Sequence, residues 1–127
     1  MMRGFVLPPA GPGRVVEWTV ESQLLGVLYR EIGVDCVDSA RVPTPAGVLS
    51  LWVDDNGLIT DQPVFNDRAI AMCRAFGYNV AALAGTVVFA GGPTSAGDTP
   101  GLTDEQLALC ERLVAVAAEA AVIEQQP

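Results

Sequence analysis

The sequence predicts an α+β domain, with a mostly antiparallel sheet of about five strands and helices packed largely on one face. Three observations lead to this fold. Residues 14–20 and 48–53 alternate in the two-residue period of strands. Residues 21–32 place their apolar side chains at helical spacing. The connections between such segments are too short for repeated right-handed crossovers, which favours antiparallel neighbours.

Five segments have the short apolar or alternating pattern of strands, bounded by glycine, proline or asparagine. They are residues 4–7, 14–20, 34–42, 48–53 and 83–90. The first two flank a loop at 8–13 that is rich in proline and glycine, so we expect them to pair as a hairpin. After the fourth segment, Asn56-Gly57 favours a type I′ turn, from which residues 58–60 are expected to return as a short strand.

Helix boundaries can be placed from capping residues. Gly33 follows the helical pattern at 21–32 and suits the end of a helix. Asn66 suits the N-cap of a short helix over 69–76, and Asp67 complements the positive end of its dipole.

We expect a single domain over residues 1–127, because a chain of this length buries one core but not two. The loops at 8–13 and 91–101 are expected to be flexible. Residues 102–124 are expected to form a long C-terminal helix.

The long helix begins with a capping box in which Thr103 is the N-cap and Gln106 the third helical residue. Its later part, residues 115–123, is apolar nearly all round, unlike a peripheral helix with one face in water. Such a segment either crosses the core or packs on a partner chain. We therefore expect a homo-oligomer that forms through the C-terminal helix.

Charge excludes several classes of partner. The net charge is −8, and all seven basic residues are arginine. Nucleic acids and anionic membranes require a cationic surface, so we expect neither as a partner. The apolar run at 113–123 is shorter than the roughly 20 residues of a membrane span. The N-terminus lacks the apolar core of a signal peptide. We expect a cytoplasmic protein.

Three cysteines, Cys36, Cys73 and Cys110, are widely separated and include no CxxC pair. The spacing therefore predicts neither a zinc site nor a thioredoxin-type redox motif. We interpret all three as buried or half-buried small apolar residues.

Most catalytic signatures are absent. Without histidine or lysine the chain has no imidazole base, no Ser-His pair, no P-loop lysine and no Schiff base. The glycine-rich residues 91–97 lack the Lys-Ser/Thr ending of a P-loop, although glycine-rich backbone can cradle an anion. We expect no enzyme and no cofactor. Asp54, Asp55 and Asp61 form the densest acidic cluster, which suits either a tight hairpin turn or a site for a hard cation.

Three residues are the best candidates for a ligand site. Arg68 lies in the first turn of the helix capped by Asn66, where backbone amides and a guanidinium favour phosphate. Trp52, on a neighbouring strand, is suited to stacking on a base, although such a tryptophan is more often part of the core.

The order of several short motifs resembles the domain of unknown function 3846 family, whose members are small phage, plasmid and bacterial proteins. The motifs are Val42-Pro43, Leu51-Trp52-Val53-Asp54-Asp55-Asn56-Gly57, Asn66-Asp67-Arg68-Ala69, Ala84-Gly85-Thr86-Val87-Val88-Phe89 and Gly101-Leu102-Thr103-Asp104-Glu105. The resemblance covers roughly residues 3–113. Two positions depart from the family pattern, with Asp67 in place of proline and Ile70 in place of threonine.

The resemblance carries no catalytic residues but implies a context. Small phage accessory proteins act in the host cytoplasm, where they cover a host protein or sequester a nucleotide second messenger. Our leading hypothesis is a non-enzymatic counter-defence protein that sequesters a nucleotide-like host signal at Asn66, Arg68 and Trp52. One alternative is an acidic protein–protein inhibitor of a host protein that mimics the charge of DNA. Another is a metal-dependent hydrolase that uses Asp54, Asp55 and Asp61.

Overall fold

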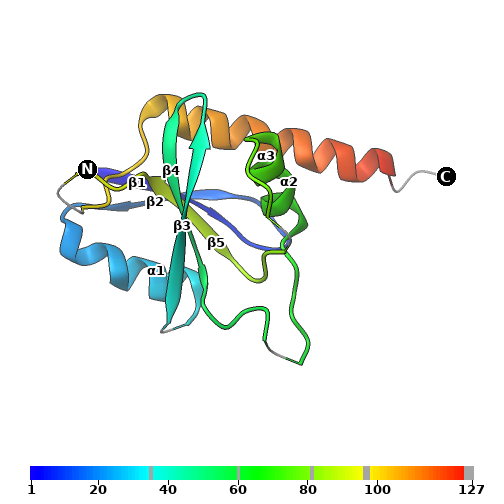
Figure 1. Cartoon of the computed structure of the whole chain (residues 1–127), viewed down its shortest axis with the longest axis horizontal. Helices are drawn as coiled ribbons and strands as arrows, with labels where there is room; N and C mark the ends of the chain where they lie inside the picture. Colours follow the sequence, from blue (N-terminus) through cyan, green and yellow to red (C-terminus); the bar gives the residue numbers. More distant parts are fainter. Residues whose placement is uncertain (35, 60, 81, 96–97, 125–127) are drawn as a thin grey trace.

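A five-stranded sheet with helices on both faces forms the body of the computed structural model (Figure 1). The strands are β1 (Met2–Leu7), β2 (Arg14–Trp18), β3 (Val37–Thr44), β4 (Gly47–Asp54) and β5 (Val87–Gly91). The helices are the 3₁₀ turn η1 (Glu21–Gln23), α1 (Leu24–Ile32), α2 (Asp67–Ala75) and α3 (Asp104–Glu124). The strand order is β2-β1-β5-β4-β3, and every neighbouring pair is antiparallel. The predicted α+β class is confirmed.

The structure describes the chain except for residues 35, 60, 81, 96–97 and 125–127, and it describes the backbone alone at 21 and 118–124. Within the described part, no helix combines the length and the apolar character needed to cross a bilayer.

Two hairpins are joined by β5. The predicted N-terminal hairpin pairs Met2 with Trp18, and the central hairpin pairs Val37 with Asp54. Strand β5 lies between β1 and β4, so Phe89 is opposite a residue of each neighbouring strand. Because β5 is fully buried, its continuous apolar sequence is explained by helices that cover both faces of the sheet.

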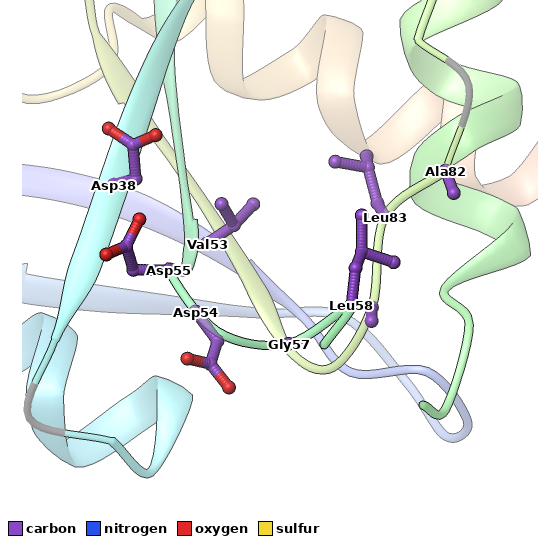
Figure 2. A pocket seen from close by; sticks show the side chains of 9 residues that line it. Asp38, Val53, Asp54, Asp55, Gly57, Leu58, Ala82 and Leu83 are labelled. Atoms are coloured by element: carbon purple, nitrogen blue, oxygen red, sulfur yellow. The ribbon is translucent and has the colours of Figure 1, made fainter. Parts of the chain in front are cut away.

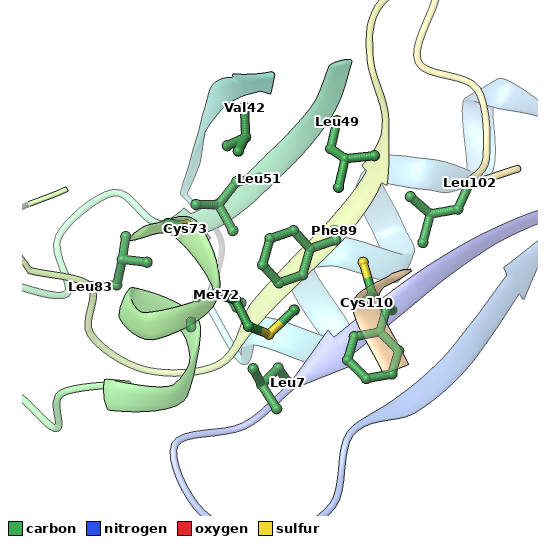
Figure 3. Close-up of a cluster of buried hydrophobic side chains, with 13 residues drawn as sticks. Leu7, Val42, Leu49, Leu51, Met72, Cys73, Leu83, Phe89, Leu102 and Cys110 are labelled. Atoms are coloured by element: carbon green, nitrogen blue, oxygen red, sulfur yellow. The ribbon is translucent and has the colours of Figure 1, made fainter. Parts of the chain in front are cut away.

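Each face of the sheet has its own core. Leu7, Leu49 and Phe89 pack under α2 and α3 (Figure 3). On the opposite face, the side chains of Val16, Val88 and Ala90 pack with α1. Two of the three α-helices thus share one face, as predicted, and α1 covers the other. The alternation of side chains along each strand produces this division.

Several predicted segments differ from the observed ones, most clearly three strands. The strand expected at 34–42 begins at Val37, and the one expected at 83–90 begins at Val87. Residues 58–59 form turns and not a returning strand, and residue 60 lies outside the described part. The carboxylate of Asp54 accepts a hydrogen bond from the Asn56 amide at 2.9 Å. Two successive backbone hydrogen bonds extend this turn, and the chain therefore leads away from β4.

The capping box of α3 is confirmed. The Gln106 amide donates to Thr103 Oγ1 at 3.1 Å, and the Thr103 amide donates to Gln106 Oε1 at 2.9 Å. The helix extends past the sheet toward the C-terminus (Figure 1). Val116 is 53% exposed, and the side chains beyond Ala117 lie outside the described part. Oligomerisation through this helix therefore stays a prediction.

The cysteines differ in burial. Cys73 and Cys110 are fully buried, as expected, but Cys36 is exposed, so the interpretation of all three as buried residues was wrong for Cys36. Burial raises the pKa of Cys73 to about 11. Burial, and secondarily the nearby Glu111 carboxylate, raise the pKa of Cys110 to about 12. The two buried thiols therefore stay protonated at neutral pH.

We predict that a disulfide reagent such as DTNB will modify Cys36 rapidly at pH 8, and Cys73 and Cys110 only after unfolding. The thiolate is the reactive form, and a pKa of about 11 leaves roughly 0.1% thiolate at that pH. The pKa of Cys73 is higher in the folded protein than in the unfolded chain. Its contribution to the free energy of unfolding is therefore fully present below the unfolded pKa and is lost as the pH rises through the folded pKa. The Cys36→Ser variant should lose the rapid phase, and a second rapidly reacting thiol in the native protein would contradict the assignment.

Candidate functional site

The three residues predicted to bind one ligand do not lie together. Trp52 is half-buried on the α1 face, where its Nε1 donates to Ser50 Oγ at 3.0 Å. Asn66 and the helix α2 that it caps lie on the opposite face. A tryptophan on the far side of the sheet cannot stack on a ligand bound at this helix, so the predicted three-residue site is corrected.

Asn66 is a structural residue with no side-chain atom left for a ligand. It is fully buried, and its Oδ1 accepts the amide of Ala69 at 3.1 Å as the predicted N-cap. Its Nδ2 donates to the carbonyl oxygens of Leu7 and Gly85, both at 2.9 Å. The side chain therefore joins α2 to the end of β1 and to the segment that precedes β5.

Arg68 strengthens the same junction. Its Nη2 donates to the carbonyl oxygen of Pro8 at 2.8 Å, directly after the carbonyl that Asn66 binds. The side chain is half-buried. Arg68 thus holds the start of α2 against the turn after β1.

The glycine-rich segment after β5 has its amides bonded within the chain. Gly91 donates to the Pro100 carbonyl at 2.9 Å, and Gly92 donates to the Val48 carbonyl at 2.9 Å. A Cβ at Gly92 would lie 2.5 Å from that same carbonyl oxygen. Close backbone packing therefore explains these two glycines. Residues 96–97 of the loop lie outside the described part.

The predicted aspartate cluster is rearranged. The Asp54 carboxylate caps its own turn, and Asp55 Oδ2 accepts a hydrogen bond from Cys36 Sγ at 3.4 Å. Among the described residues, no group of three acidic or cysteine side chains is placed to hold a metal ion. Asp61 does not line the cavity at this turn, but Asp38 does. Sequence reasoning missed Asp38, although the hairpin register places it opposite Val53.

A cavity of about 210 Å³ lies where the end of β4 meets the segment before β5 (Figure 2). Its described lining consists of Asp38, Val53, Asp54, Asp55, Gly57, Leu58, Ala82, Leu83 and Ala84. Figure 2 shows Asp38 on β3, Asp54 at the end of β4 and Asp55 in the turn that follows, with their carboxylates on the side away from Leu58 and Leu83. None of the described lining residues is basic. The cavity thus combines an acidic wall with an apolar one.

Beside this cavity lies an unusual apolar surface, which we call the apolar loop. It consists of Leu58, Ile59, Val64 and Phe65, which are 51%, 78%, 63% and 50% exposed. Its second half has a fixed backbone. The Gly85 amide donates to the Val64 carbonyl at 2.8 Å, and Phe65 forms a bridge with Ala84. The exposure of Val64 and Phe65 is therefore a property of the ordered fold.

The acidic wall and the apolar loop together can receive a side chain with an apolar stem and a cationic end. Lysine and arginine have this form, because their methylene groups pack on apolar surface while the charged group stays at a polar rim. Leu58 belongs to both the cavity and the apolar loop. The cavity can thus bind a basic side chain while the apolar loop binds apolar residues around it.

We predict that Asn66→Ala lowers the free energy of unfolding by about 3 kcal/mol, because it removes the helix cap and leaves two carbonyl groups of the junction without their donor. Urea denaturation followed by circular dichroism measures the change. Asn79→Ala, at an exposed asparagine, is the matched control and should stay within about 0.5 kcal/mol of the parent protein. A loss below about 1 kcal/mol at Asn66 would show that this amide does not hold the junction.

Comparisons with known proteins agree with the resemblance seen in the sequence. A search of curated proteins and a search of solved structures found no match to the chain. The family model for the domain of unknown function DUF3846 matches residues 2–115. This match covers both hairpins, the Asn66 junction, the acidic cavity and the first half of α3. The chain belongs to the DUF3846 family.

Proposed function

We propose that this protein is a non-enzymatic inhibitor that binds a partner protein through the acidic cavity and the apolar loop. A basic side chain of the partner enters the cavity, and apolar residues around it cover the loop. The observation that carries the proposal is the exposure of four large apolar side chains beside a cavity with three aspartates. Exposed apolar patches with a polar rim mark interaction sites on soluble proteins.

The energetics favour a protein partner. Full burial of one large apolar side chain is worth about 1.5–3 kcal/mol, so Ile59 and Phe65 are the strongest candidates for anchors. The aspartates add attraction for a cationic surface and speed its approach. The backbone bonds of Val64 and Phe65 reduce the entropy lost on binding, because this part of the loop is already ordered.

The same geometry gives less support to a nucleotide ligand. The aspartates beside the cavity repel phosphate, and Asn66 is fully used by the fold. Of the three predicted residues, Arg68 has donors left for a ligand, because within the described part of the chain its guanidinium makes one hydrogen bond, from Nη2 to the Pro8 carbonyl. Sequestration of a nucleotide-like host signal is therefore the weaker proposal. Inhibition of a host protein suits the phage-type context expected from the resemblance, with the chain acting in the host cytoplasm.

We predict that a photoreactive benzoylphenylalanine at Ile59 will cross-link one specific protein in a bacterial host lysate. Ile59 is the most exposed residue of the apolar loop, so the probe will not disturb the core. Cross-linking should weaken at least about tenfold in the Asp38→Asn/Asp55→Asn double variant and in 0.5 M salt, since screening reduces attraction between charged surfaces. Phe65→Ser should also weaken it. Mass spectrometry identifies the captured protein.

Two controls test the specificity of this result. The same probe at Val48, which is 44% exposed near the start of β4, should not capture the protein. Asp98→Asn changes an exposed aspartate outside the cavity lining and should leave capture unchanged. Equal capture from Ile59 and Val48, or capture that ignores the aspartate substitutions, would reject the proposed surface.

A further inference from the structure

The indole of Trp18 has a buried hydrogen-bond donor without an acceptor. Trp18 is 3% exposed, and among the described side chains its Nε1 is the buried polar atom that lacks a partner. The benzene ring of the indole lies over Gly4, where an added Cβ would be 3.1 Å from Cζ3. The absence of a side chain at Gly4 therefore lets the ring approach closely. A buried donor left unpaired is costly, and an incoming acceptor would remove that cost.

Trp18 also lines an open groove of about 520 Å³ between strand β2 and helix α1. The other described lining residues are Glu17, Gln23, Gly26, Val27 and Arg30. The groove exists because α1 packs over β4 and β5 and leaves β2 at its side. At the far end of β2, Arg14 forms an ion pair with Glu31 of α1. This ion pair joins α1 to β2 outside the described lining of the groove.

Gly26 has no intramolecular reason to be glycine. It lies inside α1 and is exposed, and a Cβ built on it would have no heavy atom within 4 Å. Glycine is less favourable than alanine inside a helix. Its lack of a side chain widens the groove directly opposite the strand.

Strand β2 is at an edge of the sheet and is paired with β1 alone among the described strands. Alternate residues of an edge strand direct their N–H and C=O groups away from the sheet, which forms a template for another strand. The partner that satisfies such groups is an extended backbone, because it supplies donors and acceptors at the same spacing.

We propose that the groove binds an extended peptide, which adds to β2 as a further strand and places one of its carbonyl oxygens at Trp18 Nε1. A chain of peptide groups can satisfy both the unpaired strand edge and the unpaired indole donor, and the open groove leaves room for it. Gly26 provides room for a side chain of that peptide, and Arg30 and Glu17 supply opposite charges at its rim.

Selection from a phage-displayed library of random peptides of about twelve residues, followed by NMR titration of the selected peptides, tests this proposal. The chain has two tryptophans, so its ¹H–¹⁵N spectrum contains two indole N–H signals. The Trp18 signal should move downfield as the new hydrogen bond forms. The Trp52 signal, whose donor is already bonded to Ser50, should stay in place and serves as an internal reference.

Substitutions in the groove supply the controls. Gly26→Leu places a side chain in open space, should keep or raise the melting temperature, and should weaken peptide binding at least about tenfold. Trp18→Phe removes the donor and should also weaken binding. Leu25→Ser, at an exposed residue of α1 outside the described lining, should leave it unchanged.

Three outcomes would overturn the proposal: selection without enriched peptides, equal binding to the parent and to Gly26→Leu, or a stationary Trp18 signal at saturation. Phe65→Ser, in the apolar loop, should not affect these peptides. The result is therefore separate from the test of the proposed function.

Discussion

The hydrogen bonds of the Asn66 side chain are the interactions on which the α2 and α3 face of this fold depends. The side chain binds three backbone groups that are far apart in the sequence: the Leu7 carbonyl, the Gly85 carbonyl and the Ala69 amide. One amide side chain supplies two donors and an acceptor, and no other residue of similar size supplies the same set in neutral form. Because the site is fully buried, water cannot replace any of these bonds. The end of β1, the approach to β5 and the start of α2 are thus placed relative to one another by a single residue.

The candidate binding surface follows from this junction. Phe65 directly precedes Asn66, and the Asn66 amide donates to the Leu83 carbonyl at 2.8 Å. Leu83 in turn forms a wall of the acidic cavity. The residues that anchor α2 therefore also hold the apolar loop beside the cavity. The bridge to Ala84 fixes the backbone of Phe65, whose side chain is 50% exposed.

Local signals in the sequence were sufficient to predict the N-terminal hairpin, the helix caps and the α+β class, but not the pairing of β3 with β4. The capping box at Thr103 and the N-cap at Asn66 depend on residues three positions apart, so they can be read directly. The further partners of Asn66 are 59 and 19 residues away, and no local pattern predicts them. For this reason its role was misassigned to a ligand. The alternation of β4 places Trp52 and Leu51 on opposite faces, but it does not say which helix covers which face.

Two other features required the three-dimensional structure. Asp38 joins Asp54 and Asp55 only through the register of the central hairpin, which the sequence predicted as two strands without fixing their alignment. The groove beside Trp18 depends on where α1 crosses the sheet, and helix periodicity alone does not fix that position. Gly26 was not singled out from the sequence, although an isolated glycine in a helical pattern commonly has a packing or functional reason.

The sheet separates the two surfaces that carry our proposals. The acidic cavity lies toward the β3 edge, with its apolar wall on the α2 and α3 side, and the groove follows the β2 edge beside α1. Three strands lie between β2 and β3, and the described linings of the two sites share no residue. Substitutions at distant sites without common partners have additive effects. Substitutions that weaken a partner at one proposed surface should therefore leave a partner at the other surface unaffected. Under the two proposals, this small acidic protein would bring two partners together at opposite edges of its sheet.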